Sequence, residues 1–211
     1  MCDHVEEITF KVEDRIFKAP RHLFERNSEI FATVFTLPEV DKEGCSAENP
    51  FVLEGVQSAD FEQLVQVLRS IDTAKSPGLP KESWISVLKL STLWYFIDAR
   101  NLAIQELGKQ TMDSVERILL ARRYDVSVWL RRGYAELARR PRGLSVEEAE
   151  AIGLMTALKL YQSREAALRS HYAGYESPGL GYMAPSFHRA DVDVMFKEEF
   201  RLADLASATY V

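Results

Sequence analysis

The chain has 211 residues, 46% of them hydrophobic and 27% charged. These proportions are typical of globular domains and exclude global disorder, and the length allows one domain plus an appendage. The net charge of −6 argues against general nucleic-acid binding, because phosphate contacts require a basic surface.

The sequence shows none of the signals for a membrane or a secretory route. No apolar run approaches the roughly 20 residues of a membrane span, and residues 1–10 lack the basic and apolar regions of a signal peptide. The two cysteines, Cys2 and Cys45, form no disulfide framework, which suits a reducing compartment. We therefore expect an intracellular protein, cytoplasmic or nuclear, with no membrane contact.

A β-hairpin is predicted first. Ile8, Phe10 and Val12 alternate with polar residues, which is the period of a strand with one buried face. Glu13–Asp14 supplies a polar turn, and residues 15–19 can return beside the first strand in the antiparallel direction.

Two short helices should follow the hairpin. Pro20 cannot donate to a ladder but fits a first helical turn, so the chain should enter a helix over residues 21–25. Ser28 is a good N-cap for a second helix. The apolar stripe of that helix consists of Ile30, Phe31, Val34 and Phe35.

This order of elements resembles the opening of a BTB/POZ domain, a family that commonly reads F-x-A-H-(K/R)-x-x-L and then S-x-x-F-x-x-(L/M/V)-F. Pro20 stands where the family commonly has His. Together with NPFVLEGV and WISVLKLSTLWYFIDARNLAI, the match extends over about Glu6 to Glu165 and is most similar to BTB proteins that are numerous in mushroom-forming fungi. The matching residues are Phe17, Ala19, Arg21, Phe24, Ser28, Phe31, Val34 and Phe35.

The resemblance implies an α+β fold, with a short and mainly antiparallel sheet flanked by helices. A loop over residues 37–50 should precede a third strand at 51–53. Ser58 can cap a helix whose buried side contains Phe61 and Leu68. A second loop then leads from Ile71 to Pro80.

A helical hairpin should close this first domain. One helix begins at Pro80 and continues to the region of Trp94, and Asp98 is expected to cap its partner helix. Gly108 and Thr111 weaken the second helix, so the BTB/POZ domain is predicted to cover residues 1–110.

Further helices should form an extension over residues 111–172, similar to the BACK-type extensions of many family members. Asp113 and Ser145 each have an acidic residue three positions later, which is the spacing of a capping box. After Ser145 we expect two helices, the first with Ala149 and Ile152 on its apolar side and the second with Leu154, Ala157, Leu158 and Tyr161.

Residues 173–211 are predicted to form a linker and a C-terminal amphipathic segment. The linker is rich in Gly, Pro and Tyr, and Asp191 should cap the segment that follows. Its apolar residues favour folding back on the body over docking on another protein, because exposed apolar stripes are unusual without a partner.

No arrangement of residues predicts catalysis, a cofactor or a metal site, so we do not expect an enzyme. Gly179–Ala184 matches G-x-G-x-x-A by letters, but it follows the linker and leaves too little chain for a dinucleotide-binding βαβ unit. The histidines lack the spacing of metal ligands. They are His4, His22, His171 and His188.

The resemblance implies protein association, including self-association. In dimeric members an acidic residue on the first strand and a basic residue after the second share a charged pocket near the dimer interface, and Glu7 and Arg21 match these positions. An ordinary ion pair that seals the base of the domain is an equal alternative.

A second family role is to adapt substrates to a cullin-type ubiquitin ligase, and Phe31 and Leu68 would then be partner-surface candidates. Cullin-binding members often carry a hydrophobic-x-Glu element after the matching helix, whereas this chain reads RSIDTAKSPGLPKE. No kelch or MATH module follows, so we rank this role second.

Arginines are concentrated in residues 113–143. This segment contains eight arginines and four acidic residues, so its net charge is +4. Polyanion binding is a third interpretation, and its candidate residues are Arg122, Arg123, Arg131 and Arg132. We favour the simpler interpretation that arginines fill the solvated faces of consecutive helices.

Overall fold

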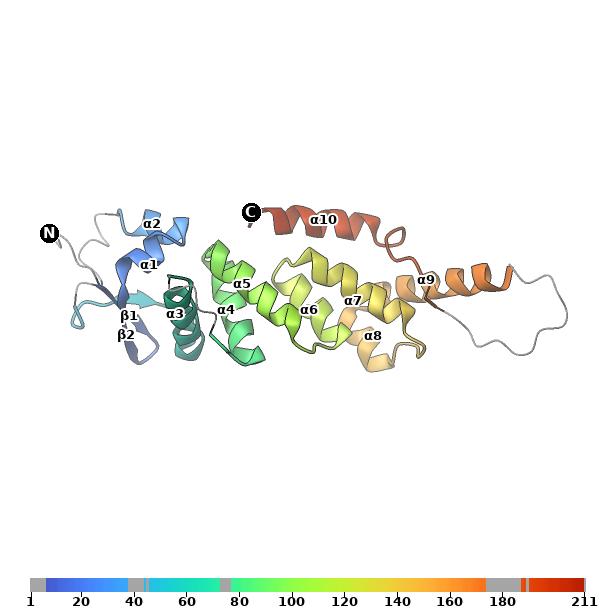
Figure 1. Ribbon diagram of the computed structural model, residues 1–211, viewed down its shortest axis with the longest axis horizontal. Helices are drawn as coiled ribbons and strands as arrows, with labels where there is room; N and C mark the ends of the chain where they lie inside the picture. Colours follow the sequence, from blue (N-terminus) through green and yellow to red (C-terminus); the bar gives the residue numbers. More distant parts are fainter. Residues whose placement is uncertain are drawn as a thin grey trace. The chain divides into compact units, whose positions relative to one another are not determined.

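The computed structural model describes residues 7–37, 44, 46–72, 77–173, 187–188 and 190–210. Cys2, Cys45, His4 and the Gly179–Ala184 motif lie outside the described residues. The fold is mixed α+β, with a three-stranded sheet and ten helices in the described part (Figure 1). Two compact units are present, one formed by residues 1–110 with Tyr210 and the other by 111–209 with Val211.

The predicted hairpin is confirmed. Strands β1 (Glu7–Val12) and β2 (Arg15–Pro20) pair in the antiparallel direction with Phe10 opposite Phe17. Strand β3 (Phe51–Leu53) pairs with β1 on its other side and runs parallel to it, so the order is β2-β1-β3. Parallel pairing follows from the long crossover between β2 and β3, which contains two helices.

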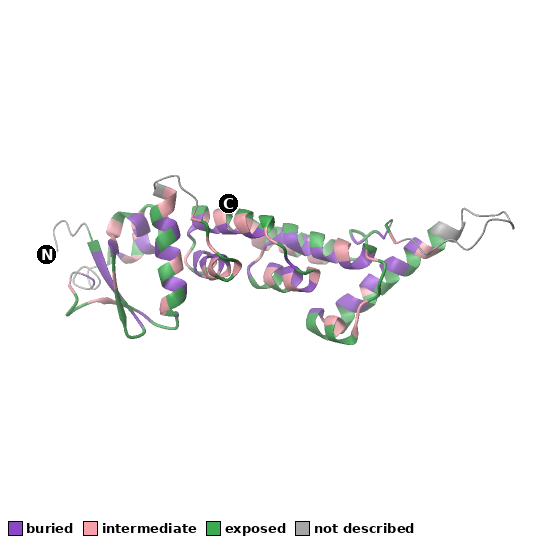
Figure 2. Cartoon of the chain, turned by 60° about the horizontal axis from the view of Figure 1, so that its bottom comes forward, coloured by how far each residue is buried: buried purple, intermediate pink, exposed green. Residues whose placement is uncertain are grey.

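An aromatic cluster fills the core of the first unit. The Phe10 ring on β1 lies 4.7 Å from Phe24 and 5.2 Å from Phe61 between ring centroids. These partners come from α1 (Arg21–Glu25) and α3 (Ser58–Asp72), whose buried sides appear in purple in Figure 2. The alternation of β1 therefore places one face of the hairpin against the helices.

The predicted Ser28 cap is also confirmed. Its hydroxyl accepts a hydrogen bond from the Phe31 N–H at 3.3 Å at the start of α2 (Glu29–Val34). The same hydroxyl donates to the Trp94 carbonyl at 2.6 Å, so the cap also ties α2 to the end of α4 (Lys81–Leu93). At α3, Ser58 is the first helical residue instead of the cap, and its N–H donates to Glu13 Oε2.

The junction between α4 and α5 (Ile97–Lys109) differs from the prediction. Asp98 lies in the first turn of α5 and not at its N-cap, which is Phe96. The break between the two helices lies at Tyr95, one residue before this N-cap. Tyr95 adopts a φ of +54°, and the Phe96 N–H donates to the Ser91 carbonyl at 2.9 Å. This left-handed residue ends α4 as a Schellman-type turn.

Four helices form the body of the second unit, namely α6 (Ser114–Arg123), α7 (Ser127–Arg139), α8 (Val146–Ile152) and α9 (Leu154–Ala173). Asp113 caps α6 by accepting from the Val115 N–H. The predicted capping box of Ser145 and Glu148 is confirmed at α8.

The two helices expected after Ser145 are present as α8 and α9, but the predicted apolar side of the second helix is wrong. Gly153 adopts a φ of +93° and separates α8 from α9, and this conformation is accessible to glycine at little cost. Three of the four residues predicted for the apolar side of α9 are exposed, namely Leu154, Leu158 and Tyr161. The buried side of α9 instead uses smaller or polar residues, among them Thr156, Ala157, Leu160, Ser163, Arg164 and Ala167.

The C-terminal segment folds back on the second unit, as predicted. Phe196 and Phe200 are buried, and their ring centroids lie 4.3 Å and 5.7 Å from the ring of Tyr134 on α7. The predicted cap is wrong, however, because Asp191 accepts from the Asp193 N–H in a turn. The helix itself, α10 (Lys197–Ala208), begins later.

Candidate functional site

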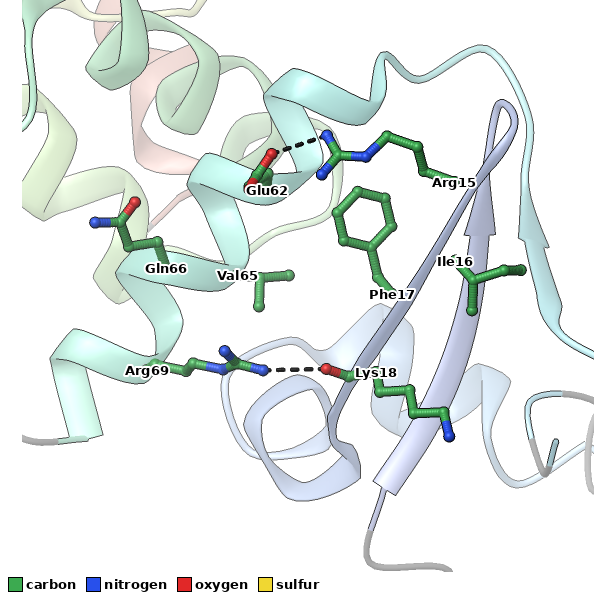
Figure 3. Close-up of a pocket in the computed structure, with 8 residues that line it drawn as sticks. All are labelled: Arg15, Ile16, Phe17, Lys18, Glu62, Val65, Gln66 and Arg69. Atoms are coloured by element: carbon green, nitrogen blue, oxygen red, sulfur yellow. Dashed lines mark hydrogen bonds and ion pairs between the residues drawn. The ribbon is translucent and has the colours of Figure 1, made fainter. Parts of the chain in front are cut away.

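A groove lies between the edge strand β2 and helix α3, with a volume of about 460 Å³ (Figure 3). The strand contributes one wall and the exposed side of the helix contributes the other. The lining residues are Arg15, Ile16, Phe17 and Lys18 from β2 and Glu62, Val65, Gln66 and Arg69 from α3.

Side-chain contacts bridge the groove toward both ends, as Figure 3 shows. Arg15 Nη1 donates to Glu62 Oε2 at 2.9 Å, and Arg69 Nη2 donates to the Lys18 carbonyl at 3.0 Å. Between them the Phe17 ring points toward α3 and contacts Phe61, with 5.1 Å between centroids. The groove therefore has an aromatic wall between the Arg15–Glu62 ion pair at one end and the Arg69 guanidinium at the other.

The face of the sheet opposite the core carries exposed apolar residues beside cations. Lys11 pairs with Ile16 on one side and with Val52 on the other, so the three residues form one row across the sheet. Ile16 is 46% exposed and Val52 is 54% exposed. Large contiguous apolar patches are typical of surfaces that bind other macromolecules, and these two side chains contribute apolar area to this face.

The structure places Glu7 and Arg21 at the same end of the hairpin, because Glu7 pairs with Pro20. Glu7 is exposed. Arg21 is held by its own helices, since Nε donates to Glu25 Oε1 at 2.6 Å and Nη2 donates to the Phe35 carbonyl at 3.0 Å. Arg21 is thus fixed beside α2 at the surface near Glu7.

Both partner-surface candidates, Phe31 and Leu68, are core residues. Phe31 is 3% exposed and Leu68 is 0% exposed. Phe31 packs against Phe24 and Phe96, with centroid distances of 5.2 Å and 5.5 Å. The expectation that these side chains face a partner is therefore corrected, and they stabilise the first unit instead.

Three of the four polyanion candidates make ion pairs inside the second unit. Arg131 Nη2 donates to Asp204 Oδ2 at 2.5 Å, and Arg132 Nε donates to Glu136 Oε1 at 2.8 Å. Arg123 is exposed and lies over the Tyr124 ring. The local excess of positive charge is therefore reduced by acidic residues of α7 and of the C-terminal segment.

Arg122, the third of the candidates that form ion pairs, lies at the centre of a polar network. Its guanidinium donates to the Ile152 carbonyl at 2.6 Å, the Tyr134 hydroxyl at 2.6 Å and Thr156 Oγ1 at 2.8 Å. Glu199 on α10 accepts from Arg122 at 3.3 Å and from the Tyr134 hydroxyl at 2.5 Å. Burial, together with the Glu199 hydrogen bond, raises the pKa of Tyr134. This network holds α10 against α7.

Buried arginines are a feature that the sequence analysis missed. Arg117 and Arg164 are both buried, so the prediction that arginines fill solvated faces is wrong for Arg117. Arg164 Nη1 donates to the carbonyls of Ala138 at 2.9 Å and Arg140 at 2.6 Å. Burial lowers the pKa of Arg164. Only the charge pattern was visible in the sequence, and it does not show which arginines reach a helix end.

The described residues contain no group of three or more His, Cys, Asp or Glu side chains that could hold a metal ion. None of the described helices is long and apolar enough to cross a membrane. No protein-family model matches the sequence, and a search of curated proteins finds no significant match.

Proposed function

We propose that the chain is a non-catalytic protein-interaction module whose first unit is a BTB/POZ-type domain and whose second unit is a BACK-like helical extension. The observation that carries the proposal is the uncovered sheet, in which Ile16, Lys11 and Val52 form an exposed row. The sequence motif supports the family, because its positions Phe24 and Phe31 are both buried in the aromatic core.

Self-association is the form of protein binding that we propose first, through the surface around Glu7, Arg21 and α1. An exposed acid and a partly exposed base lie at one end of the hairpin. In a two-fold dimer the same patch occurs on both copies, so Glu7 of one copy can lie near Arg21 of the other. Such pairs set the orientation of two copies more than their affinity.

Light scattering of the full chain at micromolar concentration, coupled to size exclusion, tests this proposal. We expect a dimer for the natural sequence, a shift to monomer for Arg21→Glu, and recovery of the dimer in the double variant Glu7→Arg/Arg21→Glu. Lys109→Glu is the matched control, because Lys109 is exposed on α5 and forms its ion pair with Glu106, three residues earlier on the same helix. A natural chain that is monomeric at every concentration would refute self-association.

We do not extend the proposal to cullin binding or polyanion binding. Phe31 and Leu68, the two candidates for the cullin surface, are buried. Arg122, Arg131 and Arg132 are paired with Glu199, Asp204 and Glu136 respectively. Neither alternative has a structural observation in its favour.

A further inference from the structure

We propose that the groove between β2 and α3 binds an extended acidic peptide of a partner protein, which adds as a strand to the outer edge of β2. This inference rests on the proposed protein-binding function but uses a surface different from that of self-association. Three features of the groove support this binding: the outward-facing backbone groups of β2, the alternation of its side chains and the charge of its lining residues.

The backbone of β2 faces the groove at alternate residues. The Lys18 carbonyl accepts from Arg69 of α3, so Lys18 directs its backbone groups away from β1. In an antiparallel pair the N–H and C=O of one residue point to the same side, and residues two apart share that side. Ile16 and Lys18 therefore present their N–H and C=O groups along the outer edge.

The Arg69 contact shows that this edge already accepts a hydrogen bond from outside the sheet. A long side chain of α3 reaches across the end of the groove to the strand backbone. Unpaired strand edges are the surfaces to which extended peptides add, with main-chain hydrogen bonds for affinity and side-chain pockets for specificity.

Alternation of the side chains defines what an added strand should contain. Phe17 points toward Val65 and the rest of α3, whereas Ile16 and Lys18 belong to the opposite face with Lys11. An added strand therefore directs every second side chain toward Phe17 and Val65, which favours apolar residues. The other side chains lie beside Lys18, which favours acidic residues.

Charge decides between a peptide of another protein and a second copy of this chain. The lining residues include three cations, Arg15, Lys18 and Arg69, and one acid, Glu62, although the whole chain has a net charge of −6. Pairing two β2 edges would bring Arg15 and Lys18 of both copies together, and like charges on adjacent strands repel. An acidic partner strand relieves this repulsion.

Peptide display on the immobilised full chain, followed by fluorescence anisotropy with a peptide from the enriched pool, tests the inference. We expect the selection to enrich peptides that alternate acidic and apolar residues. We expect Lys18→Glu to weaken binding of the labelled peptide about tenfold and Lys109→Glu to leave it unchanged. Enrichment of basic peptides, or equal binding by the Lys18→Glu variant, would overturn the proposal.

Two backbone changes separate strand addition from simple charge attraction. Ile16→Pro removes the outward N–H of an edge residue without removing a bond to β1, and proline is tolerated at such positions. We expect this variant to bind the peptide about tenfold more weakly. Thermal unfolding of the variant, measured in parallel, checks that it is folded. Methylation of alternate backbone nitrogens of the peptide should cause a similar loss of affinity. Strand addition would be excluded if the peptide kept its affinity whichever of the two alternate sets of backbone nitrogens is methylated.

The same assay distinguishes failure of this inference from failure of the proposed function. Arg21→Glu changes the self-association surface and should bind the peptide as tightly as the natural chain. A peptide that binds equally to the natural chain, to Ile16→Pro and to Lys18→Glu would show that the peptide binds elsewhere on the protein and would refute binding in the groove. If no peptide is enriched, the groove is refuted, and the light-scattering result still decides self-association.

Discussion

The two units of the chain use different interactions to hold their helices. In the first unit, ring contacts join elements far apart in sequence, as with Phe10 of β1 and Phe61 of α3. In the second unit, guanidinium groups join the helices, as with Arg164 of α9 and the C-terminal carbonyls of α7. The second unit thus adds directional hydrogen bonds from arginines to its apolar packing, whereas the aromatic cluster dominates the core of the first.

This difference has a physical consequence for how each unit responds to change. Apolar burial is non-directional and depends little on pH or salt, so the first unit should be sensitive mainly to lost volume. Buried charges are costly unless all their donors find acceptors, so the second unit should be sensitive to the loss of a single partner. Substitutions in each unit can test this contrast.

Phe10→Ala should have the largest effect, a loss of about 3–5 kcal/mol in the free energy of unfolding of the first unit. Phe10 is fully buried and contacts rings on β3, α1, α2 and α3. Urea unfolding in a Trp129→Phe background measures it, because the two remaining tryptophans, Trp84 and Trp94, lie in the first unit.

Ile16→Ala is the control for Phe10→Ala, since Ile16 lies on the same hairpin but faces away from the core. We expect this exposed substitution to change the free energy of unfolding by less than about 1 kcal/mol. Equal losses for the two variants would contradict an aromatic cluster as the main stabilising feature of the first unit.

Arg164→Leu should destabilise the second unit by about 2–4 kcal/mol, because it leaves several carbonyls without their donor. Arg164 donates to Leu137, Ala138, Arg140 and Pro141, and its guanidinium lies 3.7 Å from the centroid of the Phe187 ring. Fluorescence of Trp129 reports this unit when the two tryptophans of the first unit are replaced by phenylalanine.

Arg164→Lys sharpens the comparison between charge and directional bonding. Lysine keeps the positive charge but lacks the planar fork that serves several acceptors, so it should recover less than half of the loss. Full recovery by lysine would mean that charge alone stabilises the end of α7.

The sequence predicted the hairpin and the caps at Ser28 and Ser145, because each of these depends on residues close together in the chain. Alternation of apolar residues defines a strand face, and a serine before a helix defines a cap. The breaks at Tyr95 and Asp125 were not predictable, since both adopt φ values near +54° without being glycine. Residue type alone does not identify a left-handed position of this kind.

The candidate groove could be predicted only in part. The strand itself and the charges of Arg15 and Lys18 are visible in the sequence, whereas the edge position of β2 depends on the pairing of β3 with β1. The approach of Arg69 to the Lys18 carbonyl is not, because it joins residues 51 positions apart. The same limit explains Phe31 and Leu68, whose burial depends on packing between elements and not on local pattern.

Glu148→Gln should have the smallest effect, a loss of about 1–2 kcal/mol in the second unit at pH 7. The Glu148 carboxylate accepts hydrogen bonds from Arg140 and Arg142 and from the Ser145 N–H. The hydrogen bond from Arg140, helped by the Ser145 N–H and the charges of both arginines, lowers the pKa of Glu148 from 4.5 to about 2.

The lowered pKa of Glu148 determines how its contribution to stability varies with pH. The folded state prefers the ionised carboxylate, so this stabilisation is fully present above pH 4.5 and is lost as the pH falls toward 2. The difference in free energy of unfolding between the natural chain and Glu148→Gln should therefore be constant from pH 7 to 5 and shrink below that range. Urea titrations of Trp129 fluorescence between pH 7 and 3 measure it, and a pH-independent difference would show that glutamine loses packing and not charge.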